Sequence, residues 1–247
     1  MAIHPGMPQA GSVPYVHAVV VVPAHNEAEE LPRCLRALLT ATACVRVPVT
    51  IIVVLDDCDD GSEALAGQFG SDVHFIATDG GNVGAARAGG FGYARSLIVG
   101  TPTWYATTDA DSRVDADWLL RQMTAGADMV LGVVRVSDWR RFPADVVRRY
   151  LSAYHSGRSE HDHVHGANMG FRADAYWRCG GFRLLESGED VELVERFDAA
   201  GYRIRRDAGL SVVTSARRTG RAPGGFAQHL RDLAISNRSR LTARDSV

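Results

Sequence analysis

Three short polar segments of this sequence each follow an apolar run and carry side chains that can bind phosphate, a metal ion or a proton. They are residues 23–27 (Pro-Ala-His-Asn-Glu), the pair Asp56 and Asp57, and the segment Asp109, Ala110 and Asp111. Two carboxylates one residue apart can turn toward one hard divalent cation, and Mg²⁺ or Mn²⁺ held in this way keeps positions open for phosphate oxygens. Asp109 and Asp111 therefore indicate a metal site, although the same pattern also occurs as a helix cap or a solvated turn.

The basic residues and the glycines restrict the chemistry further. All 27 basic residues are arginines, because the sequence contains no lysine. Schiff-base chemistry and a phosphate-binding P-loop both need a lysine, so both are excluded. The glycines at 80, 81, 84, 89, 90 and 92 also lack the G-x-G-x-x-G spacing of a dinucleotide site. A bound phosphate must therefore be met by arginine, by backbone N–H groups or by a metal ion.

Composition and charge set the broad class of protein. With 247 residues and 46% hydrophobic content, the chain can build one large α/β domain. The formal net charge of -2 gives no cationic field, so nucleic acid is not expected as a partner. No apolar run approaches the roughly 20 residues of a spanning helix, so we expect no membrane span and at most peripheral membrane contact.

The cysteines and the first residues bear on the compartment. The four cysteines, at 34, 44, 58 and 179, form no C-x-x-C pair, which is typical of free thiols in a reducing compartment. The first 14 residues lack the charged start and the apolar run of a signal peptide. We therefore expect a cytoplasmic protein.

Hydrophobic periodicity predicts the elements that must position the polar segments. Strands are predicted at residues 18–22, 49–55, 73–77, 104–108, 129–136, 169–172, 202–206 and 211–214. Helices are predicted at residues 31–40, 63–69, 82–98, 116–125, 143–155, 173–179 and 190–200. This alternation predicts an α/β fold with a mainly parallel sheet and helices on both faces. Because ligands of such sheets bind beyond the carboxyl ends of the strands, the three polar segments should meet at one edge.

Five sequence blocks, in order, resemble a family 2 glycosyltransferase of the GT-A fold. They are residues 20–27 (VVVPAHNE), 53–60 (VVLDDCDD), 82–87 (NVGAAR), 108–112 (TDADS) and a long block from 166 that contains GGF at 180–182, GEDVEL at 188–193 and GYRI at 201–204. Each block is loose, and their ordered combination carries the resemblance. It implies a Rossmann-like sheet with a smaller acceptor-side subdomain, and transfer of a sugar from a nucleoside-diphosphate donor to an acceptor hydroxyl.

The resemblance also implies a division of the chain. Residues 1–15 would form an irregular leader and residues 16–136 the half that binds the nucleotide-sugar. Residues 137–221 would form the acceptor and catalytic half of the same domain, followed by a polar tail at residues 222–247.

The resemblance further implies which residues bind the donor. The nucleotide-binding set is Pro23, Ala24, His25, Glu27, Asp57, Asn82, Arg87, Asp109 and Ala110. Asp57 would bind the base or the ribose, and Arg87 would reach the diphosphate with its planar fork. The rival interpretations are that Asp57 belongs to a helix cap and that Arg87 is an ordinary residue of a helix surface.

Asp111 and Asp109 would bind the divalent cofactor, Mn²⁺ or Mg²⁺, with Asp111 the more direct ligand. The cation would neutralise the leaving diphosphate. Many GT-A enzymes add a histidine near the end of the catalytic domain, but here residues 213–218 read VTSARR. The third protein ligand is therefore not identified.

Asp190, paired with Glu189, would be the general base that takes the proton of the acceptor hydroxyl. Attack in line with the departing nucleoside diphosphate would invert the anomeric configuration. The rival interpretation is that both carboxylates only begin a helix, with charges suited to its dipole. Processive members of the family carry Q-x-x-R-W and membrane helices, whereas this chain has only QHLRD at 228–232. Transfer of a single sugar is therefore favoured.

A cluster of histidines precedes the last block. The histidines at 161, 163 and 165 alternate along one segment, and three imidazoles could bind zinc. The favoured interpretation is a polar loop on the acceptor side, with His163, His165 and Gly166 near the acceptor or the diphosphate.

The sequence thus predicts an inverting transferase that uses a UDP-, GDP- or dTDP-sugar and a hydroxyl acceptor. Two alternatives stay open, a nucleotidyltransferase that makes such sugars and a non-catalytic module that binds them. A nucleotidyltransferase would show a glycine-rich, basic entry after the first strand, where this chain has Pro-Ala-His-Asn-Glu. The sugar, the base, the acceptor and the oligomeric state do not follow from the sequence.

Overall fold

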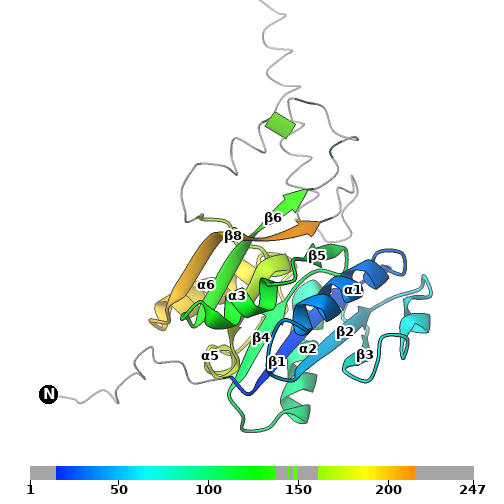
Figure 1. Ribbon diagram of the computed structural model, residues 1–247, viewed down its shortest axis with the longest axis horizontal. Helices are drawn as coiled ribbons and strands as arrows, with labels where there is room; N and C mark the ends of the chain where they lie inside the picture. The colour runs from blue at the N-terminus through cyan, green and yellow to red at the C-terminus, as the bar shows by residue number, and fades with distance from the viewer. Residues whose placement is uncertain (1–14, 137–138, 140–143, 145–146, 149–160, 215–247) are drawn as a thin grey trace, which may run out of the picture.

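The structure, a computed structural model, describes residues 15–136, 139, 144, 147–148 and 161–214. Its strands are β1 (His17–Ala24), β2 (Val49–Asp56), β3 (Val73–Thr78), β4 (Thr103–Thr107), β5 (Ser112–Val114), β6 (Met129–Val136), β7 (Met169–Arg172) and β8 (Ile204–Thr214). They form one sheet in the order β3-β2-β1-β4-β7-β6-β8-β5 (Figure 1). Only β7 and β5 run antiparallel to their neighbours, so the predicted α/β fold with a mainly parallel sheet is confirmed.

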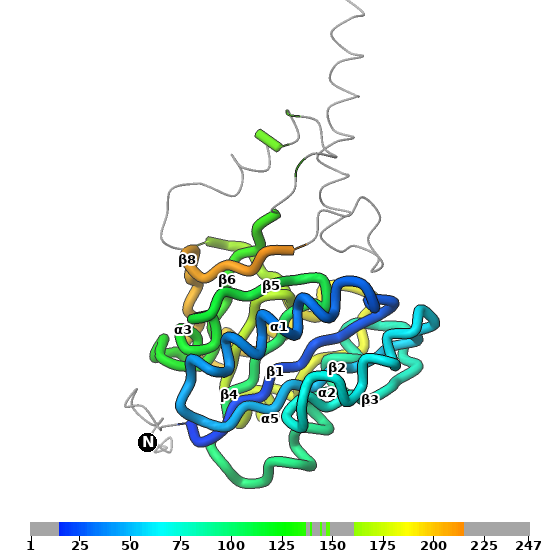
Figure 2. The backbone as a smooth tube through the Cα atoms, turned by 45° about the vertical axis from the view of Figure 1, so that its right-hand side comes forward, coloured from blue at the N-terminus to red at the C-terminus, as the bar shows by residue number. Residues whose placement is uncertain are grey.

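Helices cover both faces of this sheet. They are α1 (Leu31–Thr42), α2 (Val83–Leu97), α3 (Trp118–Thr124), α5 (Ala173–Arg178) and α6 (Glu189–Ala199), with short 3-10 turns η1 (Ser62–Leu65) and η2 (Gly166–Asn168). One hydrophobic core lies between the sheet and α1 with α3, and the second between the sheet and α2, α5 and α6. Figure 2 shows α1 crossing one face of the sheet, with β5, β6 and β8 grouped beyond it. Among the described residues, no helix is long and apolar enough to cross a membrane.

Strand β1 shows why the parallel strands β3, β2, β1 and β4 form. Its valines at 19–22 are at most 1% exposed, because they are covered by helices on both faces, and β-branched side chains suit such a strand. Pro23 continues the strand beside β2, two residues beyond the last pairing with β4, between Val21 and Thr107. A proline lacks the N–H of a sheet ladder, so it is tolerated where one neighbour has ended.

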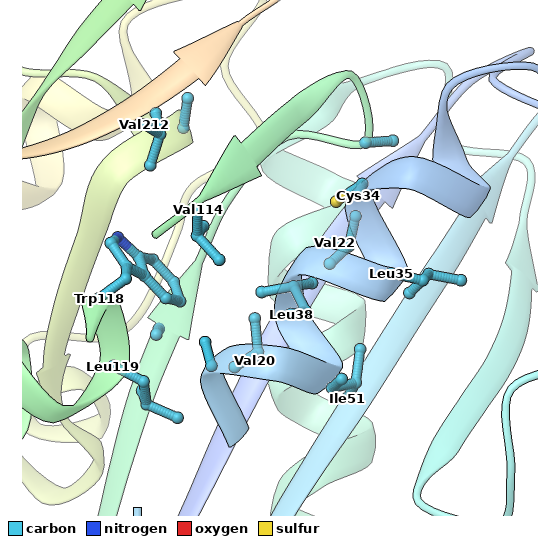
Figure 3. Packing of buried hydrophobic residues seen from close by; sticks show 14 of the residues in the cluster. Val20, Val22, Cys34, Leu35, Leu38, Ile51, Val114, Trp118, Leu119 and Val212 are labelled. Atoms are coloured by element: carbon cyan, nitrogen blue, oxygen red, sulfur yellow. The ribbon is translucent and has the colours of Figure 1, made fainter. Parts of the chain in front are cut away.

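Helix α1 is held by its apolar stripe. Leu31, Leu35 and Leu38 recur at helical spacing, are at most 1% exposed, and pack against strands β1 and β2. Figure 3 shows this packing, in which the helix side chains meet Val20, Val22 and Ile51 and the Cys34 thiol faces the same core. The helix therefore anchors the loop after β1, which carries predicted site residues.

The Asn168 side chain ties strand β6 to strand β8. Strands β6 and β8 shift register at Gly132, and the Asn168 Nδ2 donates to the carbonyls of Val133 and Leu210, each at 3.0 Å. Its Oδ1 accepts a hydrogen bond from Trp118 Nε1 at 2.8 Å. Buried polar groups of this kind specify one arrangement when every partner is present. Asn168 thereby fixes η2, which begins at Gly166.

Three predicted elements were wrong. Residues 202–206 and 211–214 were expected as separate strands, but they form the single strand β8, because the bulge opposite Gly132 absorbs the irregular segment between them. The helix expected at residues 63–69 is only the 3-10 turn η1, since the left-handed backbone of Gly67, at φ 79°, interrupts it. Of the helix expected at residues 143–155, only positions 144, 147 and 148 are described, and the first 14 residues of the leader and the tail at 222–247 lie outside the described residues.

Candidate active site

The loops after β1 and β2 are tied together at the carboxyl ends of these strands. His25 Nδ1 donates to the carbonyl of Asp56 at 2.7 Å. Asn26 Oδ1 accepts a hydrogen bond from the Asp59 N–H at 2.8 Å, and Ala28 N–H donates to Asp60 Oδ2 at 2.7 Å. The segments predicted to line the nucleotide pocket are therefore one connected structure.

Two residues of these loops have a left-handed backbone without being glycine. Asn26 has φ 56° and Asp57 has φ 50°, a conformation that is uncommon for residues with a side chain. Such positions cluster at ligand sites because the surrounding structure must hold them there. Asp57 directly follows β2 and its side chain is exposed, so it is open to a ligand that binds beside the loop after β1.

Cys58 connects the same two loops and was not predicted as a site residue. Its thiol donates to the carbonyl of Ala24 at 3.3 Å and accepts a hydrogen bond from the Asn26 N–H at 3.4 Å. The sequence predicted only a free thiol at this position, since a single cysteine carries no motif. Burial raises the pKa of the Cys58 thiol, so it serves here as a neutral hydrogen-bonding group.

Asp56 and Asn82 connect β2 to the start of α2. The buried Asp56 carboxylate accepts hydrogen bonds from the N–H groups of Gly81 at 3.0 Å and Asn82 at 2.8 Å. Asn82 caps α2 by accepting from the Ala85 N–H at 3.0 Å, and its Nδ2 donates to the carbonyl of Leu185. Asn82 therefore holds its own helix and the segment before α6, and its contact with a nucleotide stays a prediction. Asp56 was predicted only as a member of the polar pair with Asp57, without a role of its own.

The segment of Asp109 and Asp111 follows β4, at the same edge of the sheet. Asp111 Oδ1 accepts hydrogen bonds from the hydroxyls of Thr214 at 3.2 Å and Ser112 at 3.4 Å. Thr214, at the end of β8, thus contacts Asp111. It lies in the stretch 213–218, where many GT-A enzymes have a histidine and this chain has none. Beneath it, the buried Cys34 thiol donates to the Asp109 carbonyl at 3.5 Å.

Arg87 joins the Asp109 segment to α6. Its side chain is 4% exposed, its Nη2 donates to Asp109 Oδ1 at 2.7 Å, and its Nη1 donates to Glu189 Oε1. The interpretation of Arg87 as an ordinary surface residue is therefore wrong. Burial raises the pKa of Asp109 to about 6; Arg87 opposes this rise and the Asp111 carboxylate adds to it. Contact of Arg87 with a diphosphate stays a prediction.

Glu189 and Asp190 both make contacts beyond their own helix. Glu189 is buried against Arg87, and Asp190 Oδ2 accepts a hydrogen bond from the Gly166 N–H at 2.7 Å. A Cβ added at Gly166 would overlap the Arg87 guanidinium, so only glycine lets η2 approach so closely. The residues predicted for the cation, the base and the acceptor side therefore lie in one connected cluster.

The predicted cation ligands suit a metal shared with a phosphate ligand. No group of three or more His, Cys, Asp or Glu side chains in the described part of the chain is placed to hold a metal ion. Mg²⁺ and Mn²⁺ commonly take one or two carboxylates and complete their shell with phosphate oxygens and water. Asp109 uses Oδ1 for Arg87, and no described residue donates a hydrogen bond to its Oδ2. The donor set of Asp109 and Asp111 fits such a cation.

The histidines at 161, 163 and 165 lie along the segment that leads into η2. Their rings stack in sequence, with centroids 5.9 Å apart and planes 19° and 16° apart. The rings are thus parallel neighbours and do not converge on one point. His161 is buried and its Nε2 donates to the carbonyl of Leu131 at 3.2 Å, while the segment ends at Gly166, beside Asp190.

Comparison with solved structures supports the fold. The S. aureus TarS 1–349 structure in complex with UDP-GlcNAc aligns with a TM-score of 0.59 and 14% identity, over 89% of this chain and 66% of that one. The mannosyltransferase PcManGT from Pyrobaculum calidifontis, in complex with GDP-Man and Mn²⁺, aligns with a TM-score of 0.58 and 18% identity, over 87% and 68%. The chain thus spans about two thirds of the length of these two proteins.

The sequence itself matches a family model. The model describes glycosyl transferase family 2 and matches residues 19–180, which include the loops after β1, β2 and β4 together with η2. The match covers well over half of the chain, and the chain belongs to glycosyl transferase family 2.

Proposed function

We propose that the protein is a metal-dependent glycosyltransferase that moves one sugar from a nucleoside-diphosphate sugar to an acceptor hydroxyl, with inversion at the anomeric carbon. The observation that carries this proposal is the buried Arg87, which contacts Asp109 on one side and Glu189, the neighbour of Asp190, on the other. This contact supports a role for the predicted cation ligands and the candidate base in one site at the edge of the sheet. Family membership supports sugar transfer as the reaction.

The donor would bind at the tied loops after β1 and β2. Pro23, Ala24, His25 and Glu27 would line the nucleotide pocket, with Asp57 directed at the base or ribose. The nucleotide would be UDP, GDP or dTDP. The solved neighbours support this class of donor, since one is in complex with UDP-GlcNAc and another with GDP-Man.

Asp109 and Asp111 would hold Mn²⁺ or Mg²⁺ beside the donor diphosphate. When bound, the cation would neutralise the charge that develops on the leaving diphosphate. Asp109 would offer the carboxylate oxygen that Arg87 does not occupy, while Thr214 and Ser112 orient Asp111.

Asp190 would take the proton of the acceptor hydroxyl as that oxygen attacks the anomeric carbon. The new carbon–oxygen bond forms as the bond to the diphosphate oxygen breaks, and the electron pair leaves with the diphosphate. One displacement of this kind inverts the configuration. His163 and His165, on the segment that ends at Gly166, would contact the acceptor.

A donor screen tests this proposal. The protein is incubated with Mn²⁺ and UDP-, GDP- or dTDP-sugars, with pooled hydroxyl acceptors, and released nucleoside diphosphate is measured. We expect release from one donor class that stops when EDTA removes the cation. A nucleotidyltransferase would instead release pyrophosphate from a nucleoside triphosphate and a sugar 1-phosphate, and that result would contradict the proposal.

A further inference from the structure

The ion pair between Arg87 and Glu189 lies behind the candidate cation site. The side chains of Arg87 and Glu189 are 4% and 6% exposed, so water screens their charges little. The same guanidinium donates to Asp109 Oδ1 through its other nitrogen, Nη2. Glu189 is therefore connected to the predicted cation ligand Asp109 through the guanidinium of Arg87 and is not a predicted ligand itself.

The charges of the cluster indicate what Glu189 contributes. Asp109 and Asp111 together offer two negative charges to a divalent cation, but Arg87 in contact with Asp109 cancels one of them. Glu189 neutralises Arg87 from the opposite side, so the four side chains together still carry two negative charges. Without Glu189, a divalent cation would meet one net negative charge from Asp109, Asp111 and Arg87, and the Nη1 of Arg87 would lose its carboxylate partner.

The hydrogen-bond geometry leads to the same conclusion. A guanidinium can hold both oxygens of one carboxylate with its planar fork. Here one nitrogen of the fork is directed to Glu189, so Asp109 loses only Oδ1 to Arg87. Glu189 therefore leaves the second oxygen of Asp109 to a cation.

Two glycines keep this arrangement in place. A Cβ added at Gly84 would lie 3.1 Å from Glu189 Cγ and 2.6 Å from the Arg183 carbonyl, and a Cβ at Gly166 would overlap the guanidinium of Arg87. Close packing on both sides limits the positions open to Glu189 and Arg87.

We propose that Glu189 is a positioning residue for the cation, which neutralises and orients Arg87 so that Asp109 keeps its charge and one oxygen for the metal. This assignment rests on the proposed function, because it requires the cation site. It separates the roles of two adjacent carboxylates: Glu189 acts on the metal side through Arg87, and Asp190 acts on the acceptor.

The test measures Mn²⁺ affinity by calorimetric titration of the full chain with the metal alone, so that the predicted contact of Arg87 with the diphosphate does not enter the comparison. We expect Glu189→Gln to weaken Mn²⁺ binding by about 10- to 100-fold, the usual effect of losing an outer partner of a metal ligand. The matched control is Glu192→Gln, which removes a carboxylate from the same turn of α6 where it pairs with Arg183 and Arg196 instead. The control should change the affinity by less than about twofold.

A double variant tests whether Glu189 acts through Arg87. Arg87→Gln combined with Glu189→Gln removes both buried charges and restores two net negative charges at Asp109 and Asp111. We expect the double variant to bind Mn²⁺ more tightly than Glu189→Gln alone, since coupled residues are not additive. It also keeps the test valid if the single variant does not fold, because its affinity should then lie within about tenfold of the wild type.

The outcomes separate this inference from the proposed function. Wild-type affinity for Mn²⁺ in Glu189→Gln, or a double variant as weak as the single one, would overturn the role of Glu189 and leave the glycosyltransferase proposal intact. A wild-type protein that binds no Mn²⁺ on its own would overturn the role of Glu189, and one that also binds none with UDP, GDP or dTDP would overturn the proposed function as well.

Discussion

The Asp190 carboxylate accepts a hydrogen bond from the backbone N–H of Gly166, 2.7 Å away. The second oxygen of Asp190 accepts from the Val191 N–H at 2.8 Å, so both oxygens are oriented by backbone groups. Gly166 itself lies against Arg87, which holds Asp109. The candidate base is therefore positioned by rigid backbone in the same cluster as the candidate cation ligands.

Replacing Asp190 by asparagine should remove the base and leave the donor site nearly unchanged. We expect kcat to fall by about 10²- to 10⁴-fold, the usual contribution of general base catalysis, with donor affinity within about twofold of the wild type. The measurement is the rate of nucleotide release together with a calorimetric donor titration. Asp198→Asn, at the exposed end of the same helix, serves as the control. A near wild-type rate in Asp190→Asn would show that another group is the base.

Asp111→Ala should weaken binding of the nucleoside diphosphate in the presence of Mn²⁺ and should not affect any binding that occurs without it. The reason is that the variant loses a predicted cation ligand but keeps the loops after β1 and β2. Calorimetric titration of the nucleoside diphosphate with and without Mn²⁺ measures the two affinities. Asp115→Ala, an exposed carboxylate four residues further along, is the control. Unchanged Mn²⁺ dependence in Asp111→Ala would reject its role as a ligand.

Local sequence signals were enough to predict most of the fold and the residues at the strand ends. The apolar runs of β1, β2 and β4 lie within a few residues of their predicted bounds, because a strand buried on both faces leaves a continuous hydrophobic pattern. The polar residues that follow these strands lie at one sheet edge for the same topological reason. By contrast, β5 is only three residues long and was not predicted, since so short a strand carries no periodicity.

The contacts between distant residues could not be predicted. Arg87 and Glu189 are 102 positions apart, and nothing in either segment indicates that a buried guanidinium would join them. The same holds for Thr214 with Asp111, which depends on where the end of β8 lies, and for Cys58 with Ala24, which depends on how the loops after β1 and β2 fold against each other. Sequence patterns predicted the residue types at the site, and tertiary packing determined their partners.

Two glycines of α2 should respond in opposite ways to alanine. A Cβ at Gly84 would lie 2.6 Å from the Arg183 carbonyl, whereas nothing lies within 4 Å of a Cβ at Gly89. We expect Gly84→Ala to lower the free energy of unfolding by about 1–3 kcal/mol through overpacking. Gly89→Ala should raise it by about 0.5–1 kcal/mol, because alanine is the better helix former. Urea unfolding of both variants measures this, and a stabilised Gly84→Ala would contradict the packing described.

Acid should destabilise the protein through His161. Burial lowers the pKa of His161 below its ordinary value of 6.5, so between the two values the unfolded chain binds more protons than the folded one. The contribution of His161 to the free energy of unfolding is therefore complete above pH 6.5 and declines as the pH falls below it. Urea unfolding at pH 7.5 and at pH 5.5 should show a smaller loss in His161→Gln than in the wild type. Equal losses in both proteins would contradict this assignment.

The central claim is that Asp109 and Asp111 bind a divalent cation beneath a nucleoside diphosphate, in the cluster that also holds Asp190. The most direct measurement is calorimetric titration of the wild-type protein with UDP and GDP, with Mn²⁺ and then with EDTA. We expect at least one nucleotide to bind only when the cation is present. Binding of neither nucleotide, or binding that EDTA leaves unchanged, would contradict it.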